Sequence, residues 1–522
     1  MSVHTREPVT ARSASAWLLF CAMGSVVALL PVLLSLPFLS EPLGHDPAVY
    51  FTVVHSGTLP YAEVFDHKPP LIYVWYALSM FMSGGEPSRQ IVNLLAALQL
   101  SATALAAGWI GLLLGGRRLA LVAGLLMALV VSNRYLQFDA NTEVFMLPPL
   151  VLSVALSIVG LRRRQMRWFC LAGAFCGLAM MTKTVAIFNL VAMVAALAWG
   201  AATGQVPWSN ARRWSAALVG CSALIVVLTA VPFIASGTFG EFWHANVTYN
   251  IAYNAQVPIF AKLFRFSEID GRVIVGALPV WTLAIIGAVL ACRSIPTLPV
   301  ALLLASAVGA FAGAVSTGWQ YPHYFVTLTP FAALFAAMAL VAMRNDWHSR
   351  SRRLHVELFL IALALPTLLA LLPLYALDAD QVYEITHDRV EADRAIADEE
   401  IASYIASATE PGDRIYNVGR ETQLYVFSDR YPAGYYIRSR AFDVQPETFE
   451  KTMRSLEAEP PALIVDTSIM DFSEFDQPGL VGSRDELTTE QRMRLNGFLA
   501  ERYDFQRRIK HATVYTLKKP HP

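Results

Sequence analysis

The ionisable residues best suited to chemistry lie in one polar loop that follows the first long apolar segment of the sequence. Asp46 comes soon after that segment, so its carboxylate is expected near the surface of a membrane, beside Lys68. A carboxylate there can accept a proton from a hydroxyl group, and a lysine can neutralise a phosphate. Either residue alone is more often a solvated loop charge. Their occurrence together with Lys183 favours a functional site.

Three further groups begin or interrupt apolar segments. Lys183 lies between two apolar runs, where its side chain can also simply reach toward the membrane surface. Glu143 opens an apolar segment, where the helix dipole already favours an acid. His323, followed by Tyr324, heads a later segment, and a lone histidine there is often only an anchor. Two acids, two lysines and a histidine on one face would suit a reaction in which a phosphate leaves.

The composition shows what kind of protein must position these residues. Of the 522 residues, 55% are hydrophobic and only 15% are charged, and the mean hydropathy is +0.45. A soluble chain of this length would carry charge on about a quarter of its residues. The apolar residues also fall in long runs without the alternation of half-buried helices or strands. A soluble globular enzyme and a disordered chain are therefore excluded, and a multi-span membrane protein is predicted.

The cysteines and the N-terminal segment add little chemistry. All five cysteines lie in apolar segments, so the polar regions offer neither a disulfide framework nor a cysteine metal site. The first apolar stretch lacks a clear cleavage site for a signal peptidase. We expect it to be a retained span.

A membrane span needs about 17–25 apolar residues. Eleven spans are predicted, at 16–39, 90–114, 119–133, 144–161, 168–182, 184–203, 214–235, 276–292, 298–316, 324–343 and 354–376. A twelfth apolar run, 69–83, is short, begins with two prolines and is rich in aromatic residues. We expect this run to form an interfacial or re-entrant helix.

Lysine and arginine decide the predicted orientation, because they collect in cytoplasmic loops. With the dense basic loop at 162–167 placed in the cytoplasm, the cytoplasmic segments hold 15 bases and two acids, and the opposite loops hold seven bases and ten acids. Counting 69–83 as a crossing would destroy this bias. The scheme predicts a bacterial plasma (inner) membrane protein with a cytoplasmic N-terminus, and it places Asp46, Lys68, Glu143, Lys183 and His323 on the extracytoplasmic face.

The net charge of zero hides two unlike parts. Residues 377–522 hold 27 acids and 18 bases, a balance of −9, and residues 1–376 carry the compensating +9. We therefore predict a transmembrane domain at 1–376 and an extracytoplasmic domain at 377–522. Helices are expected at 388–407, 446–458 and 488–502, and strands at 414–418, 462–466 and 503–517, which is a small α/β domain. We expect this domain to stand over the site and to help select the acceptor.

Three classes of function remain open at this point. No charged residue lies deep inside a predicted span, which disfavours a lipid-linked sugar or polymer transporter or flippase, because transporters usually need such groups. A binding or scaffold role centred on the C-terminal domain would not require the charged loop residues. An enzyme that works at the outer membrane face fits the sequence best.

Several motifs together resemble a known family. They are Asp-Pro-x-x-Tyr from Asp46, Phe-Asp-His-Lys-Pro-Pro-Leu from Phe65, Gly-Leu-Ala-x-x-Thr-Lys ending at Lys183, and Pro-His-Tyr from Pro322. In this order, over roughly residues 40–340, they resemble the polyprenyl-phosphate-dependent glycosyltransferases of the GT-C superfold. Within that superfold, the motifs resemble those of the protein O-mannosyltransferases and lipid A aminoarabinose transferases. The resemblance implies a GT-C type helical membrane fold of about eleven spans with an interfacial helix and a C-terminal α/β domain.

The resemblance also implies roles for single residues. Asp46 would be the catalytic base, and Lys68 and Lys183 would bind the lipid phosphate together with His323 and Tyr324. This chain has Pro47 where many relatives carry a second acid and His67 where some relatives carry one, so the identity of a second acid stays open. Asp66 and Glu143 are candidates for that role, and His67 and Tyr61 are further candidates for acceptor binding.

The expected reaction is an inverting displacement. A sugar would pass from a polyprenyl-phosphate donor to an unknown glycan, lipid or protein acceptor, while Asp46 takes the acceptor proton. No cofactor is expected, and no metal dependence, because the sequence shows no ligand cluster with metal-like spacing. The expected partners are the donor, the acceptor and membrane lipids, and nucleic acid is not among them.

Overall fold

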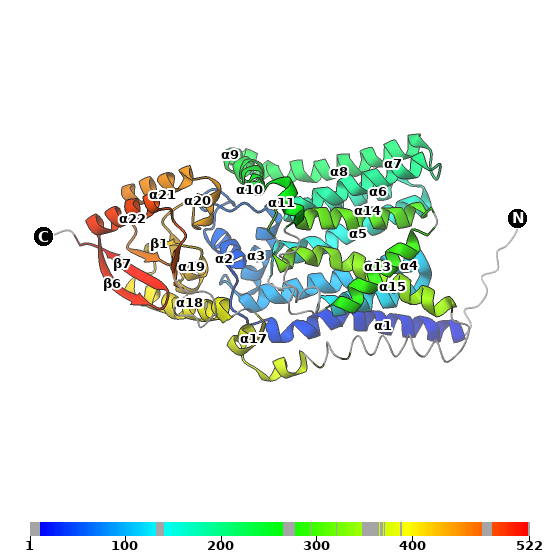
Figure 1. Cartoon of the computed structure of the whole chain (residues 1–522), viewed down its shortest axis with the longest axis horizontal. Helices are drawn as coiled ribbons and strands as arrows, with labels where there is room; N and C mark the ends of the chain where they lie inside the picture. The colour runs from blue at the N-terminus through cyan, green and yellow to red at the C-terminus, as the bar shows by residue number, and fades with distance from the viewer. Residues whose placement is uncertain are drawn as a thin grey trace, which may run out of the picture.

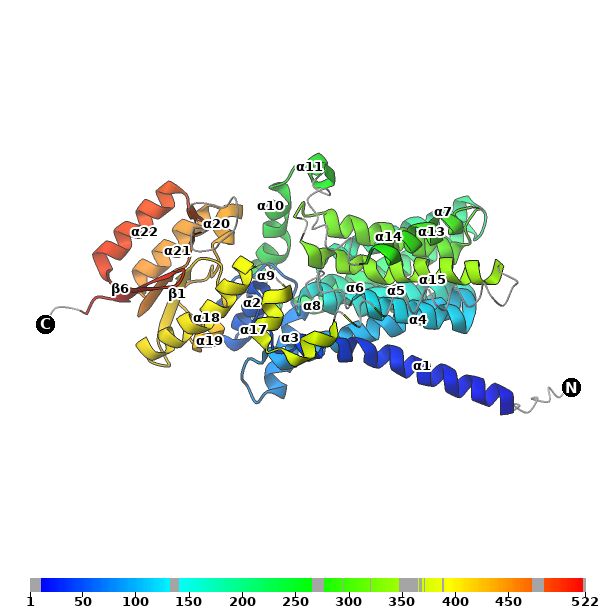
Figure 2. The ribbon, with the colours of Figure 1, turned by 60° about the horizontal axis from the view of Figure 1, so that its bottom comes forward.

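The protein consists of a long helical bundle with an α/β domain at one end. The computed structural model describes residues 11–131, 140–264, 277–293, 295–319, 321–346, 365, 369, 371–386, 389–471 and 483–519. Figure 1 shows the bundle helices running side by side, with the α/β domain beyond their ends and the N-terminus at the far end of the bundle. The same arrangement holds in the turned view of Figure 2.

The bundle is built from long apolar helices. They are α1 (Ala11–Ser35), α4 (Arg89–Val130), α5 (Thr142–Arg163), α6 (Met166–Thr182), α7 (Ile187–Ala202), α8 (Trp208–Ala235), α13 (Leu278–Ala291), α14 (Leu298–Val315) and α15 (Thr329–Asp346). Within the described residues, seven helical segments are long and apolar enough to cross a membrane. The prediction of a multi-span helical membrane protein is therefore confirmed.

Each predicted span from 16–39 to 324–343 coincides with a helix or with one arm of a helix, whereas most of 354–376 lies outside the described residues. The number of crossings stays a prediction. Helix α4 contains two of the expected spans, 90–114 and 119–133, because Gly116 adopts a positive φ of 81° and breaks the helix. Its two arms turn back on each other, since a Cβ at Gly111 would lie 2.8 Å from the carbonyl oxygen of Leu119.

Small residues let neighbouring helices approach closely, which is the usual way in which helices pack in lipid. A Cβ at Gly173 of α6 would lie 2.4 Å from the carbonyl oxygen of Leu218 on α8. A Cβ at Gly287 of α13 would lie 1.9 Å from the carbonyl oxygen of Phe335 on α15. These contacts fix α8 against α6 and α13 against α15.

Short helices lie between the bundle and the α/β domain. They are α2 (His45–His55), α3 (Leu71–Met82), α9 (Phe239–Trp243), the π-turn η4 (His244–Thr248), α10 (Tyr249–Ala255) and α11 (Ile259–Phe264). The 12 residues of α3 extend for about 18 Å, which is too short to cross a hydrocarbon core of about 30 Å. This length agrees with the expectation that residues 69–83 do not span the membrane.

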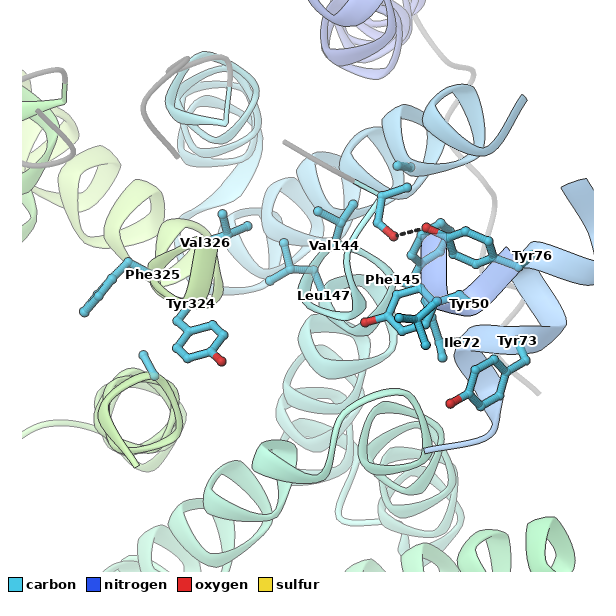
Figure 3. Packing of buried hydrophobic residues seen from close by; sticks show 14 of the residues in the cluster. Tyr50, Ile72, Tyr73, Tyr76, Val144, Phe145, Leu147, Tyr324, Phe325 and Val326 are labelled. Carbon is cyan, nitrogen blue, oxygen red and sulfur yellow. Dashed lines mark hydrogen bonds between the residues drawn. The ribbon is translucent and has the colours of Figure 1, made fainter. Parts of the chain in front are cut away.

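Aromatic packing holds α2 and α3 against the start of α5. The rings of Tyr50 and Tyr76 meet edge to face with their centroids 5.1 Å apart, and both residues are fully buried. The Tyr76 hydroxyl donates a hydrogen bond of 2.8 Å to the carbonyl oxygen of Ala140 (Figure 3). Trp75 stacks on Phe145 of α5 with centroids 5.3 Å apart. The helices on either side of the polar loop, α2 and α3, are therefore fixed by packing against α5.

The C-terminal domain is the predicted α/β domain. Its main sheet has the order β2-β1-β3-β7-β6, formed by β1 (Arg414–Val418), β2 (Tyr431–Pro432), β3 (Leu463–Asp466), β6 (Tyr503–Ile509) and β7 (Ala512–Leu517). Strands β1, β2 and β3 are parallel, and β7 runs antiparallel to β3 and β6. The strands β4 (Ile469–Asp471) and β5 (Ser483–Asp485) form a separate pair. The division of the chain at residue 377 stays a prediction.

The described part of the C-terminal region also forms helices. They are α17 (Ala379–Thr386), α18 (Arg389–Ala408), α19 (Gln423–Ser428), α20 (Arg440–Val444), α21 (Glu447–Ala458) and α22 (Thr489–Arg502). The first of them, α17, packs beside the end of α1. Helix α22 starts with a capping box, in which Thr488 and Gln491 satisfy each other's backbone N–H groups. The segment between β1 and α20 faces the short helices of the bundle end.

Candidate functional site

Asp46 lies in the first turn of α2, where the free N–H groups and the helix dipole favour a negative charge. Its carboxylate contacts two cations. Oδ2 lies 3.0 Å from Nζ of Lys68, and Oδ1 accepts a hydrogen bond of 2.7 Å from Nη1 of Arg438. The Tyr50 hydroxyl, one turn further along α2, lies 3.4 Å from Oδ2. The prediction that Asp46 and Lys68 lie side by side is correct, and Arg438 joins them from the α/β domain.

The two cations control the protonation of Asp46. Burial alone would raise the pKa of this carboxyl group, but Lys68 and Arg438 outweigh burial and hold the pKa well below its usual value. The opposite balance applies to Lys68, whose pKa burial would lower. The carboxylates of Asp46, Asp66 and Glu143 reverse that effect and raise it. Asp46 is therefore ionised and Lys68 is charged at neutral pH.

Asp66 has a different role from Asp46. Its side chain is only 3% exposed, and Oδ2 accepts a hydrogen bond of 2.9 Å from the Tyr73 hydroxyl. Oδ1 accepts a hydrogen bond of 2.7 Å from the backbone N–H of His67. Oδ1 thus holds the backbone that leads into Lys68, and Oδ2 ties the same residue to the side chain of Tyr73 in α3. This arrangement fits a structural acid better than the second catalytic acid that the sequence left open.

Tyr61 supports the same loop. This residue is fully buried with a positive φ of 69°, and its hydroxyl donates a hydrogen bond of 2.5 Å to the carbonyl oxygen of Lys68. The imidazole of His67 lies with Nε2 3.5 Å from Nζ of Lys68. Burial and the charge of Lys68 lower the pKa of His67, so this ring is neutral at pH 7. Tyr61 therefore holds the backbone of Lys68, and His67 adds no second positive charge beside its ammonium group.

The second group of predicted residues forms another cluster. Glu143 lies in the first turn of α5, Lys183 lies between α6 and the short helix η3 (Thr184–Ala186), and His323 and Tyr324 lie in η6 (Pro322–Leu328). Lys183 donates a hydrogen bond to Glu143, and Nε2 of His323 lies 3.7 Å from the same carboxylate oxygen. Nζ of Lys183 also lies 4.0 Å from the centroid of the Tyr324 ring. Glu143, Lys183 and Tyr324 line a small pocket together with Gly313 and Thr317.

The two clusters lie at the same end of the bundle, where Glu143 is one of the carboxylates that raise the pKa of Lys68. Figure 3 shows Tyr324 on one side and Tyr50 on the other side of the α5 residues Val144 and Leu147. The sequence placed five residues on one face, and the structure places all five at the end of the bundle that faces the α/β domain. They are Asp46, Lys68, Glu143, Lys183 and His323.

Arg438 is the site residue that sequence reasoning missed. No local pattern marks it, and the surplus of acids in the C-terminal domain points away from a cation there. The fold supplies it, because this domain packs on the loop through several contacts. Thr422 donates a hydrogen bond of 3.0 Å to the carbonyl oxygen of His45, and the backbone N–H of Phe65 donates one of 2.8 Å to the carbonyl oxygen of Tyr435.

A metal site would need several ligands in one place. In the ranges that the structure describes, no three or more His, Cys, Asp or Glu side chains are grouped so that they could hold a metal ion. The site is built instead from carboxylates that face cations. Independence from metals and cofactors stays a prediction.

The comparisons with known proteins agree with this geometry. Residues 67–233 match the profile of the dolichyl-phosphate-mannose-protein mannosyltransferase family, a range that includes Lys68, Glu143 and Lys183. No curated protein sequence matches the chain. The structure of ArnT from Cupriavidus metallidurans bound to undecaprenyl phosphate is similar, with a TM-score of 0.59 and 16% identity over 96% of this chain and 98% of that one.

A second similar structure comes from an archaeon. The oligosaccharyltransferase AglB from Archaeoglobus fulgidus, in complex with an inhibitory peptide and a dolichol-phosphate, has a TM-score of 0.54 and 12% identity over 86% of this chain and 69% of that one. These likenesses show a shared fold. The resemblance to GT-C polyprenyl-phosphate-dependent glycosyltransferases that the motifs indicated is confirmed.

Proposed function

We propose that this chain is an integral-membrane glycosyltransferase that moves a sugar from a polyprenyl-phosphate donor to an acceptor on the extracytoplasmic face. The observation that carries the proposal is Asp46 beside Lys68 at the bundle end, with Lys183 in the adjoining cluster. Asp46 can take a proton there, and Lys68 and Lys183 can hold a phosphate. The match to the mannosyltransferase family and the lipid phosphates bound by ArnT and AglB support the donor class.

The proposed reaction is a single displacement with inversion. The acceptor hydroxyl or amine attacks the anomeric carbon, and Asp46 takes its proton. The bond between the anomeric carbon and the phosphate oxygen breaks, and both bonding electrons leave with the polyprenyl phosphate. Lys68 and Lys183 hold the charge that develops on that phosphate, and His323 and Tyr324 line the same side. The acceptor is a cell-envelope glycan, lipid or protein.

Two effects supply most of the rate. A positioned base is worth about 10²–10⁴-fold. Cations aimed at developing charge in a site shielded from water contribute about as much again, since removal of one such donor typically costs about 10²–10³-fold. The side chains of Lys68 and Lys183 are each only 11% exposed, so their charges are weakly screened. The positive charges that stabilise the leaving phosphate are therefore in position before the bond to the sugar breaks.

The orientation in the membrane belongs to the same proposal. Helix α5 begins at the site with Glu143 and ends at Arg162 and Arg163, and its 22 residues extend for about 33 Å. The basic loop at 162–167 and the site thus lie at opposite ends of the bundle. Lysine and arginine favour the cytoplasmic side, so the site and the α/β domain would face outward in a bacterial inner membrane.

The proposal can be tested with the full chain in lipid vesicles and a polyprenyl-phosphate sugar that carries a radiolabel in the sugar. A glycosyltransferase releases polyprenyl phosphate and labels an added envelope acceptor. A flippase moves the intact labelled lipid across the bilayer, and a scaffold only binds it. Movement or binding without any transfer to a panel of envelope glycans, lipids and proteins would refute the proposed function.

A further inference from the structure

Arg438 brings a cation of the α/β domain onto the proposed base. The residue lies between β2 and α20, and its Nη1 is 2.7 Å from Oδ1 of Asp46. Lys68 holds the other oxygen, with Nζ 3.0 Å from Oδ2. One carboxylate therefore bridges two cations that belong to different parts of the chain.

Asp46 is a poor base in this arrangement. Each of its oxygens contacts a cation, Oδ1 with Arg438 and Oδ2 with Lys68. These cations outweigh burial and hold the pKa of Asp46 well below its usual value. An anion that drew Lys68 and Arg438 away would make Asp46 a stronger base.

A phosphate suits this exchange. Like a carboxylate, it presents two oxygens on one central atom, and a guanidinium binds it through two parallel N–H groups. Nη1 of Arg438 is used by Asp46, but among the described residues its buried Nε has no hydrogen-bond partner. The guanidinium therefore has a buried donor to spare, and its Nη1 shares the Asp46 carboxylate with Lys68.

The neighbouring Arg440 shows that this placement is particular to Arg438. Arg440 has its guanidinium carbon 4.3 Å from the centroid of the Trp319 ring, and its Nη1 lies 3.3 Å from Asp443. It is thus stacked on the bundle and paired within its own helix. Arg438 is the arginine of this segment that reaches the proposed base.

We propose that Arg438 binds the phosphate of the lipid donor, and that this phosphate replaces Asp46 as the counter-ion of Arg438 and Lys68. The proposal rests on the proposed function, since it names a further donor-binding residue of the same site. In the state described here Asp46 holds both cations. When the donor is bound, its phosphate holds them and Asp46 is free to accept a proton. The α/β domain thereby supplies part of the donor site.

The test measures equilibrium binding of undecaprenyl phosphate and of uncharged undecaprenol to the full chain in nanodiscs. The variants are Arg438→Gln, Arg438→Lys and Asp46→Asn. The matched control is Arg89→Gln, because Arg89 forms another ion pair between the bundle and the α/β domain, 2.6 Å from Glu399 and away from Asp46.

Arg438→Gln should weaken binding of undecaprenyl phosphate by about 10- to 100-fold, the range expected for loss of a hydrogen bond to a charged group, and leave undecaprenol binding unchanged. Arg438→Lys should fall between this variant and the wild type, because it keeps the charge and loses the two parallel donors. Arg89→Gln should bind both lipids as the wild type does. Equal weakening by Arg89→Gln and Arg438→Gln would show a docking role only and overturn the proposal.

Asp46→Asn gives an independent result that does not depend on the folding of the glutamine variant. It should bind undecaprenyl phosphate more tightly than the wild type, because the two cations lose the carboxylate that competes for them. Weaker binding by Asp46→Asn, or unchanged binding by Arg438→Gln, would overturn the inference and leave the proposed function standing. A wild-type protein that binds undecaprenol as well as undecaprenyl phosphate would overturn both.

Discussion

The pair formed by Glu143 and Lys183 allows a structural role to be separated from a role in donor binding. Lys183→Met leaves Glu143 buried, with its side chain 2% exposed. Breaking a buried ion pair by removing one partner typically costs about 3–5 kcal/mol of unfolding free energy. Glu143 keeps a hydrogen bond of 2.9 Å from Thr142 and a contact of 3.7 Å with His323, so we expect the lower end, about 3 kcal/mol.

The double variant Glu143→Gln, Lys183→Met should regain most of that loss, because replacement of both members of a buried ion pair is often close to neutral. Activity should behave differently. If Lys183 holds the donor phosphate, both Lys183→Met and the double variant should lose transfer, by about 10²–10³-fold. The double variant should therefore have nearly wild-type stability and still lack transfer activity. A pair with a purely structural role would recover both.

The assay is thermal unfolding of the wild type, the two single variants and the double variant in the same detergent, followed by transfer from a labelled polyprenyl-phosphate sugar. Two results would refute the reasoning. Additive destabilisation in the double variant would show that Glu143 and Lys183 do not act as a pair. Near-normal transfer by a stable double variant would show that Lys183 does not hold the phosphate.

Four further predictions follow from the same geometry. Asp46→Asn should keep the fold and lose about 10²–10⁴-fold in transfer, and near-normal turnover would contradict its role as base. Asp66→Asn should mainly lower thermal stability, because Asp66 holds the loop backbone, and a loss of transfer as large as that of Asp46→Asn at unchanged stability would contradict this role. Burial would raise the pKa of Glu421, but Arg394 and His45 outweigh it and hold the pKa at about 2, below the ordinary 4.5. Glu421 therefore stabilises the fold above about pH 4.5 and loses this effect as the pH falls toward 2, so the stability difference between wild type and Glu421→Gln should shrink in melts from pH 7 to pH 3. A topology reporter fused after residue 86 should be extracytoplasmic, and a cytoplasmic signal would contradict the orientation.

The helical part of the fold was predictable because the bilayer leaves few choices. A chain in lipid must satisfy every backbone N–H and C=O group internally, so each long apolar run becomes a helix. The break at Gly116 was also readable, since Gly115 and Gly116 precede two arginines between two apolar runs. The packing of the helices could not be predicted from the sequence. A contact such as that of Gly287 with Phe335 depends on which faces of α13 and α15 meet in the folded protein.

Most of the residues gathered here, and the pairing of Asp46 with Lys68, were predictable from the sequence, whereas Arg438 and the contacts of Asp66 were not. Asp46, Lys68, Glu143 and Lys183 stand out because residues 1–376 hold only 13 acids and 22 bases, and few of these lie on the predicted extracytoplasmic side. The sequence could not say that Asp66 turns away from the site toward Tyr73 while Glu143 turns toward Lys183. Those directions follow from side chains that are remote in sequence and meet only after folding.

The net charge of the C-terminal domain gives no sign of the cation that this domain brings to Asp46. A surplus of acids describes the average surface, whereas binding depends on the one side chain that faces the site. The domain presents Arg438 to Asp46, and at the same interface Thr422 contacts the backbone of His45, directly before Asp46. The α/β domain thus holds Asp46 through both its side chain and the adjoining backbone. Under the proposed function, this contact would have to change whenever Asp46 takes a proton, which would couple the docking of the domain to the chemistry at Asp46.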